Sequence, residues 1–228
     1  MYNNNNFHPN VKSFPEHIAL IPDGGRRWAK KNNKTNLEAY YVSMCSIVKM
    51  IDYSFAQGTK YFSVYLASTL NFKRSDKEVN DFCTAEWEFL NNIFLPYAIE
   101  NDIKIKIVSA DDINIKPFLK YITIIESKTA NGKKTVYFCF NYSSFNEIEI
   151  AVDKANKTGE SFVNYLEIPY PVDILIRTGN ANVLSGFLLP QIAMARIFFS
   201  PKLFNDFTID DFKHVVNDYI RYELKYGE

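Results

Sequence analysis

Short apolar runs rich in β-branched and aromatic residues alternate along this chain with longer segments whose apolar side chains recur every three or four residues. The short runs predict strands at residues 18–21, 61–67, 103–108, 135–140 and 172–176. The longer segments predict helices at residues 37–55, 79–99, 113–127, 146–156, 187–199 and 208–226. Because parallel strands need crossover connections, this alternation predicts an α/β fold with a mainly parallel central sheet flanked by helices.

The chain is long enough, at 228 residues, to bury one substantial core. No linker, repeat or low-complexity stretch divides it after the Asn-rich first six residues. We therefore expect a single domain at residues 17–228, preceded by a flexible N-terminal segment at residues 1–16.

Charge and cysteine content exclude several classes of protein. The 26 basic residues balance the 26 acidic ones, whereas general nucleic-acid binders usually carry a basic surplus. No apolar run is long enough for a transmembrane helix. The cysteines (Cys45, Cys83 and Cys139) have no metal-like spacing, so we expect free thiols in a reducing compartment and a cytoplasmic protein.

Arginine is scarce, since only six of the 26 basic residues are Arg. Four of the six follow or end predicted strands, namely Arg26, Arg27, Arg74 and Arg177. Ligands of parallel sheets bind at the carboxyl ends of the strands, and the guanidinium fork suits phosphate better than the Lys ammonium does. The pattern indicates an anion site, although a single arginine also falls at such a position without any function.

The segment Asp23-Gly24-Gly25 lies between the first predicted strand and a helical segment. Its glycines allow backbone N–H groups to turn toward an anion, and a carboxylate beside phosphates suits Mg²⁺. The alternative is an ordinary turn between a strand and a helix. The glycine spacing fits neither a P-loop nor a dinucleotide-binding fingerprint.

Three segments of this sequence, at residues 17–31, 67–79 and 173–191, resemble in content and order the motifs of the cis-prenyltransferases, typified by undecaprenyl diphosphate synthase. Residues 198–227 resemble the usual ending of that family. The resemblance implies a cis-prenyltransferase-like fold and a homodimer. It also implies the Mg²⁺-dependent transfer of an allylic group from its diphosphate to isopentenyl diphosphate.

The resemblance also implies roles for individual residues. Asp23 would be both a catalytic residue and the metal ligand, and Ser68 and Asn71 would lie near the site of proton removal. The residues implied to bind the allylic diphosphate are Gly24, Gly25, Arg26, Arg27 and Arg74. Arg177 and Ser185 would hold the second diphosphate.

Several positions depart from the family pattern. Tyr40 stands where a charged or ionisable side chain is usual, and Leu70 replaces an acid. Val183 replaces an arginine of the second diphosphate site, and Arg196 replaces a glutamate. Leu66 stands where the tunnel for the hydrocarbon chain generally has a small residue, which predicts a shorter tunnel.

These departures favour an atypical prenyltransferase that forms a short, irregular (head-to-middle) or cyclic prenyl diphosphate. Tyr40 and Leu70 are similar to the lavandulyl and cyclolavandulyl diphosphate synthase branch. The expected substrates are dimethylallyl, geranyl, farnesyl or isopentenyl diphosphate. Two alternatives remain open, a terpene synthase that ionises one diphosphate and a weakly catalytic binding subunit of a prenyltransferase complex.

Overall fold

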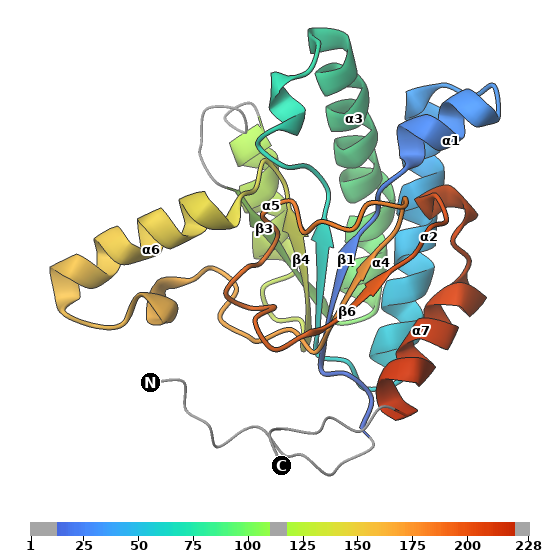
Figure 1. The fold of residues 1–228 in the computed structure, drawn as a ribbon. Helices are drawn as coiled ribbons and strands as arrows, with labels where there is room; N and C mark the ends of the chain where they lie inside the picture. Colours follow the sequence, from blue (N-terminus) through green and yellow to red (C-terminus); the bar gives the residue numbers. More distant parts are fainter. Residues whose placement is uncertain (1–12, 110–117, 222–228) are drawn as a thin grey trace.

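The computed structural model describes residues 13–109 and 118–221. Its six strands form one sheet in the order β3-β4-β2-β1-β5-β6, and each neighbouring pair is parallel (Figure 1). The strands are β1 (His17–Ile21), β2 (Tyr61–Tyr65), β3 (Ile103–Val108), β4 (Lys134–Cys139), β5 (Ile174–Arg177) and β6 (Arg196–Phe199). The predicted single-domain α/β class is thereby confirmed.

The helices connect these strands and flank the sheet (Figure 1). They are α1 (Gly25–Lys31), α2 (Asn36–Ala56), α3 (Asp76–Phe89), α4 (Leu95–Glu100), α5 (Leu119–Lys128), α6 (Ser144–Thr158) and α7 (Ile209–Arg221). Helix α2 begins with a capping box of Thr35 and Glu38, which satisfies backbone N–H groups that the first helical turn leaves unpaired. Helix α7 is preceded by a similar capping pair, in which Thr208 and Asp211 each accept a hydrogen bond from the backbone N–H of the other.

Helices α2, α3 and α7 cover one face of the sheet with a continuous apolar layer. This apolar layer contains Ile18 and Leu20 of β1, Phe62 and Val64 of β2, Met44 and Ile47 of α2, and Phe82 and Phe89 of α3. Strands buried on both faces need apolar side chains throughout, which explains why their sequences are continuous apolar runs. The carboxyl ends of the strands all point toward the top of Figure 1.

The predicted helix at residues 187–199 is wrong. Turns occupy the segment up to Ala195, and the chain then continues as β6 beside β5. Ser185, Gly186 and Leu188 have positive φ angles, which an α-helix does not allow. An apolar run this short does not distinguish a buried strand or turn from a helix by periodicity.

Arg196 accordingly lies at the start of β6 rather than on an apolar helix. Its Nη1 donates a hydrogen bond of 2.6 Å to the carbonyl oxygen of Asp218, and its guanidinium lies 4.5 Å from the ring centre of Phe198. Through these contacts the Arg196 side chain connects β6 to α7.

Some predicted segments extend beyond the described residues, which exclude 1–12, 110–117 and 222–228. Within the predicted N-terminal segment, Pro15 accepts a hydrogen bond of 2.8 Å from Thr59, and Phe14 contacts Tyr53. The helix predicted at residues 79–99 forms as α3, a π-helical segment (Leu90–Phe94) and α4. Across the ranges that the structure describes, no helix is both long and apolar enough to cross a membrane.

Candidate active site

Asp23 lies directly beyond β1, at the centre of the carboxyl edge of the sheet. Strand β1 pairs with β5 so that Ile21 lies opposite Arg177. Arg177 Nη2 is 3.0 Å from Asp23 Oδ2, and Arg27 Nη2 is 3.1 Å from Asp23 Oδ1. Both oxygens of this carboxylate therefore accept hydrogen bonds from predicted substrate-binding arginines.

Arg177 is held firmly, with only 7% of its surface exposed. Its Nη1 donates to the carbonyl oxygen of Val183 at 2.7 Å and to Ser185 Oγ at 2.8 Å. Its Nε is buried and has no hydrogen-bond partner among the described residues. Predicted residues Arg177 and Ser185 are thus in contact.

Thr178 fixes the turn that carries Asp23. Its hydroxyl accepts from the backbone N–H of Asp23 at 3.0 Å and donates to the carbonyl oxygen of Asp23 at 2.9 Å. Gly24 has a φ of 114°, which favours glycine, and α1 begins at the next residue. Sequence reasoning gave Thr178 no role, although it lies within the motif that contains Arg177.

Gly179 is required by close packing in the same place. Its φ is 85°, and a Cβ atom there would lie 2.7 Å from Arg27 Nη2 and 2.8 Å from the carbonyl oxygen of Asp23. The absence of a side chain therefore lets the ends of β1 and β5 approach each other.

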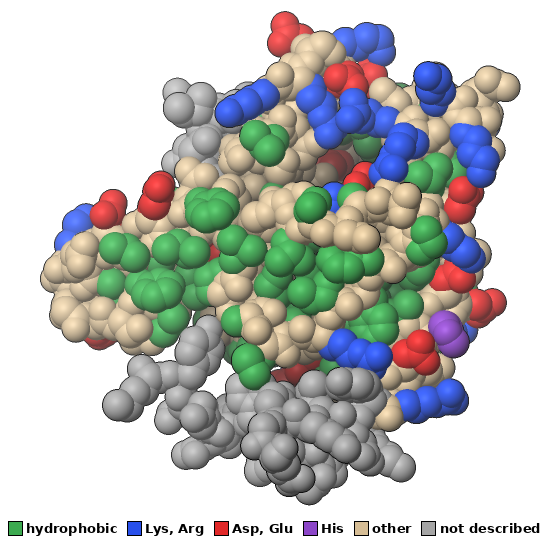
Figure 2. Space-filling view, viewed as in Figure 1, with side chains coloured by type: hydrophobic (Ala, Val, Ile, Leu, Met, Phe, Trp, Pro, Cys, Tyr) green, Lys and Arg blue, Asp and Glu red, His purple; other side chains and the backbone are tan. Residues whose placement is uncertain are grey.

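Arg26 and Arg74 form the other side of the cluster. Arg26 Nη1 is 2.6 Å from Glu78 Oε1 on α3, an acid that sequence reasoning did not select. Burial and the neighbouring Arg26 charge lower the pKa of Arg74, while the Asp23 charge raises it. Figure 2 shows Lys and Arg side chains gathered over α1 and the start of α3. The structure thus brings the predicted arginines together around Asp23.

Tyr40 of α2 faces this cluster. A Cβ atom on Gly25 would lie 3.9 Å from Tyr40 Cε1, so the ring approaches the start of α1. Burial raises the pKa of the Tyr40 hydroxyl. The charges of Arg74 and Arg26 lower this pKa, but by less than burial raises it. The neutral phenol is therefore available as a hydrogen-bond donor.

Ser68 and Asn71 contact each other after β2, as a catalytic pair would require. Asn71 Oδ1 accepts from both the hydroxyl and the backbone N–H of Ser68, each at 2.7 Å. The nearby Tyr65 hydroxyl lies 3.1 Å from the carbonyl oxygen of Ser185. This contact joins the end of β2 to the loop that holds Arg177.

The apolar side chains that depart from the family pattern differ in how deeply they are buried. Leu66 is partly buried and packs against the apolar layer, where the family resemblance places the tunnel wall. Leu70 is 65% exposed and Val183 is 58% exposed, so the side chains that replace charged groups are at the rim.

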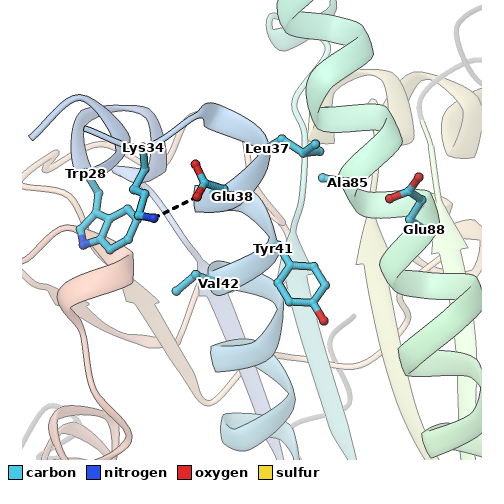
Figure 3. A pocket seen from close by; sticks show the side chains of 8 residues that line it. All are labelled: Trp28, Lys34, Leu37, Glu38, Tyr41, Val42, Ala85 and Glu88. Carbon is cyan, nitrogen blue, oxygen red and sulfur yellow. Dashed lines mark hydrogen bonds and ion pairs between the residues drawn. The ribbon is translucent and has the colours of Figure 1, made fainter. Parts of the chain in front are cut away.

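One cavity of about 370 Å³ lies outside this cluster, between α1, α2 and α3 (Figure 3). It is lined by Trp28, Lys34, Leu37, Glu38, Tyr41, Val42, Ala85 and Glu88. Glu38 forms an ion pair of 3.0 Å with Lys34 there. No predicted substrate-binding residue lines this cavity, so it is not the predicted diphosphate site.

Asp23 is the residue that fits a magnesium ion. Its side chain is one-third exposed and contacts Arg27 and Arg177, where a diphosphate would supply further oxygens. Mg²⁺ in such sites takes one or two carboxylates together with phosphate oxygens. No cluster of three or more metal-ligating side chains is present within residues 13–109 and 118–221, so the fit requires the bound diphosphate.

Comparisons with known proteins point to one family. The family model for prenyltransferases, described as undecaprenyl diphosphate synthase, matches residues 21–227. The chain is 30% identical over 242 residues to the ditrans,polycis-undecaprenyl-diphosphate synthase ((2E,6E)-farnesyl-diphosphate specific) of Micrococcus luteus, covering 98% of this chain and 95% of that protein. It is 33% identical over 228 residues to an isoprenyl transferase of Fusobacterium nucleatum, with 95% and 97% covered.

Two solved structures share the fold. Lavandulyl diphosphate synthase from Lavandula x intermedia, in complex with dimethylallyl diphosphate, matches with a TM-score of 0.84 at 24% identity, covering 94% of this chain and 99% of that chain. A probable undecaprenyl diphosphate synthase from Campylobacter jejuni matches with a TM-score of 0.78, also at 24% identity, with 93% and 98% covered. The chain therefore belongs to the prenyltransferase family that includes the undecaprenyl diphosphate synthases.

Proposed function

We propose that this prenyltransferase acts on short allylic diphosphates and forms a short, irregular (head-to-middle) or cyclic prenyl diphosphate. The observation that carries this proposal is the carboxylate of Asp23 held between Arg27 and Arg177. The allylic substrates would be dimethylallyl, geranyl or farnesyl diphosphate. The second substrate would be another allylic diphosphate or isopentenyl diphosphate.

The first diphosphate would bind at Gly24, Gly25, Arg26, Arg27 and Arg74, with Tyr40 as a neutral donor. Breaking the allylic C–O bond moves negative charge onto the leaving diphosphate. Cations already held in place stabilise that charge more in the transition state than in the ground state. The Arg26–Glu78 and Arg27–Asp23 contacts hold two of these guanidinium groups in position.

Asp23 would hold Mg²⁺ together with the first diphosphate, and the ion would neutralise part of the leaving-group charge. Phosphate oxygens would then accept hydrogen bonds from the guanidinium groups of Arg27 and Arg177, which contact Asp23.

The second diphosphate would bind at Arg177 and Ser185. Arg177 Nη1 also donates to the carbonyl oxygen of Val183, while the Val183 side chain supplies no charge. Each lost charge-assisted hydrogen bond weakens binding by about 1.5–3 kcal/mol. A site with one arginine would bind the diphosphate of the second substrate more weakly than a site with two, and Ser68 and Asn71 would lie near the proton that is lost.

Large side chains below the site favour a short product. Leu66 packs against the apolar layer, and Phe140 lies 5.3 Å from Phe72 and 5.4 Å from Trp87 between ring centres. A growing chain between the sheet and α3 would have to displace these rings. This packing is consistent with products shorter than an undecaprenyl chain.

We also propose that the protein acts as a homodimer. Figure 2 shows a band of apolar side chains across the face formed by α6, β6 and the segment before β6. Its exposed members include Phe145, Val183, Met194, Ile197 and Phe199. An exposed apolar patch of this kind marks an interaction surface. Sedimentation should give twice the monomer mass, and M194D should shift the protein toward the monomer.

The test of the proposed reaction is incubation with Mg²⁺ and each allylic diphosphate, with and without isopentenyl diphosphate. Products are identified by mass spectrometry and gas chromatography, and released diphosphate is measured separately. A branched or cyclic prenyl diphosphate supports the proposal. No product from any combination contradicts it, and a long linear Z-polyprenyl diphosphate would identify an ordinary chain-elongating enzyme.

A further inference from the structure

The segment at residues 183–189, here called the Ser185 loop, carries groups of the proposed second diphosphate site. Val183 supplies a carbonyl oxygen and Ser185 a hydroxyl to Arg177 Nη1, at 2.7 Å and 2.8 Å. The φ angles of Ser185 and Leu188 are positive, at 53° and 48°. Residues other than glycine rarely adopt such angles, so this backbone conformation persists only where its surroundings hold it.

Tyr65, the last residue of β2, contacts the Ser185 loop through both its hydroxyl and its ring. The hydroxyl lies 3.1 Å from the carbonyl oxygen of Ser185. The ring stacks on Phe187, with 4.5 Å between ring centres and 9° between ring planes. The ring of Tyr142 packs edge-on against both, with centres 6.0 Å from Tyr65 and 6.1 Å from Phe187. Tyr65 therefore holds the loop on both sides of Gly186.

The Tyr65 hydroxyl acts as a hydrogen-bond donor to the loop. Burial raises the pKa of this hydroxyl, so it keeps its proton at neutral pH. The hydroxyl also lies 3.1 Å from the carbonyl oxygen of Tyr142. That carbonyl oxygen accepts a second hydrogen bond, of 3.2 Å, from the backbone N–H of Thr69. Because Thr69 already satisfies Tyr142, the single proton of Tyr65 is available to Ser185.

Ser144, at the start of α6, contacts the same loop from another element. Its backbone N–H donates to the carbonyl oxygen of Gly186 at 2.9 Å, and its Oγ accepts from the backbone N–H of Leu189 at 2.8 Å. The loop is thus fixed to both α6 and β2. The contact from β2 is the one made to Ser185 itself, so Tyr65 is the residue that sets the position of the proposed ligand-binding hydroxyl.

Resting on the proposed second diphosphate site, we propose that Tyr65 is a positioning residue that holds Ser185 and Arg177 in the orientation that binds the second diphosphate. Only 7% of the Tyr65 surface is exposed, so it acts through the loop rather than on the substrate. Arg177 contacts the loop through Nη1 and Asp23 through Nη2. Loss of the Tyr65 contact should therefore weaken binding of the second substrate and spare the allylic site.

The test compares the wild-type protein with two variants of Tyr65 and one control. Tyr65→Phe removes the hydroxyl and keeps the ring on Phe187, whereas Tyr65→Leu removes both contacts. Tyr137→Phe is the matched control, because Tyr137 is 5% exposed and belongs to the same apolar cluster as Tyr65. It lies on the neighbouring strand β4, two residues before the Cys139 that pairs with Tyr65. Thermal unfolding establishes that each variant is folded.

Calorimetry measures the affinity for isopentenyl diphosphate, and separately for dimethylallyl diphosphate, with Mg²⁺ and an unreactive geranyl thiolodiphosphate filling the first site. Tyr65→Phe should weaken binding of the second diphosphate by about 2- to 13-fold, the effect of one lost hydrogen bond. Tyr65→Leu should weaken it by about 2- to 13-fold more, because the ring stack is also lost. Tyr137→Phe should bind like the wild-type protein.

Kinetics separate positioning from a general loss of structure. With geranyl and isopentenyl diphosphates as substrates, Tyr65→Phe should raise the KM for isopentenyl diphosphate and leave kcat and the KM for geranyl diphosphate unchanged. A merely structural defect would change the KM for both substrates. Tyr65→Phe should also weaken binding less in a Ser185→Ala background than alone, because both residues act through one contact.

Three results would overturn the inference: unchanged binding by Tyr65→Phe, equal losses in Tyr65→Phe and Tyr137→Phe, or no binding of a second diphosphate by the wild-type protein. Product identity tests the proposed function separately. A long linear product together with weaker binding by Tyr65→Phe refutes the proposed short product and retains the positioning role. A branched or cyclic product together with unchanged binding does the reverse.

Discussion

Asp23 Oδ2 and Arg177 Nη2 lie 3.0 Å apart, although 154 residues separate them in the sequence. Adjacent parallel strands place the two groups at the same edge of the sheet, and Thr178 fixes the backbone between them. The contact unites the proposed metal ligand and the proposed second diphosphate site in one hydrogen-bonded unit. A substitution at either residue will therefore change both sites.

Asp23→Ala should lower the rate of diphosphate release by about 100-fold or more, because a fixed group that stabilises transition-state charge is lost. The fold should persist, since the Asp23 side chain is one-third exposed. Rates come from diphosphate release and folding from thermal unfolding. A variant with near-normal rates would show that Asp23 does not carry the metal-dependent step.

Gly179→Ala should reduce activity strongly, because the new Cβ would meet Arg27 Nη2 at 2.7 Å. Gly159→Ala is the matched control, since Gly159 has a similar φ of 75° and nothing within 4 Å of the added atom. Backbone strain should cost each variant about 1 kcal/mol of stability. Gly179→Ala should lose more, because its Cβ would also lie 2.8 Å from the carbonyl oxygen of Asp23. Only Gly179→Ala should lose activity, and equal activities would exclude a role for this close contact.

Leu66→Ala should lengthen the products, because it opens space where the resemblance places the tunnel wall. Leu119→Ala removes the same atoms from a half-exposed position on α5 and should leave product length unchanged. Mass spectrometry of the prenyl products from farnesyl and isopentenyl diphosphates measures the difference. An unchanged distribution in Leu66→Ala would place the limit on chain length elsewhere, such as at Phe140.

His17 should make the protein less stable in acid. Burial lowers its pKa from 6.5 to about 4, and its ring is hydrogen-bonded to Ser63 at 2.8 Å. Between those pH values the unfolded chain binds a proton that the native protein does not, so stability falls as the pH falls. The loss should approach about 3 kcal/mol near pH 4.

Denaturant unfolding from pH 7 to pH 4 measures this loss. His17→Asn should remove most of the slope, whereas His214→Asn should keep it because the His214 side chain is 77% exposed. The same slope in all three proteins would assign the acid sensitivity to other groups.

The site could be predicted from the sequence because a parallel sheet imposes a simple rule. The residues that follow parallel strands lie at one edge, so Asp23 and Arg177 could be placed at the same edge without knowledge of the strand order. Their direct contact depends on the pairing of β1 with β5. The contacts that orient them could not be predicted in this way. Thr178 acts through both its hydrogen-bond donor and its acceptor, and its position in a motif does not reveal that geometry.

The remaining differences also have physical reasons. The run from Phe187 to Phe199 is mostly apolar and therefore favours a helix by pattern. Ser185 and Leu188 have positive φ angles that prevent a helix there, but these residue types do not predict such angles.

The central position of β1 has a consequence for the synthesis of the protein. Strand β1 precedes the other described strands in the chain, and its edge opposite β2 stays open during synthesis until β5 emerges more than 150 residues later. An open apolar strand edge is a template for aggregation, and long-range parallel pairing is slow. The nascent chain therefore exposes a strand edge next to its proposed active site, and the pairing of β5 with β1 both covers the edge and assembles that site.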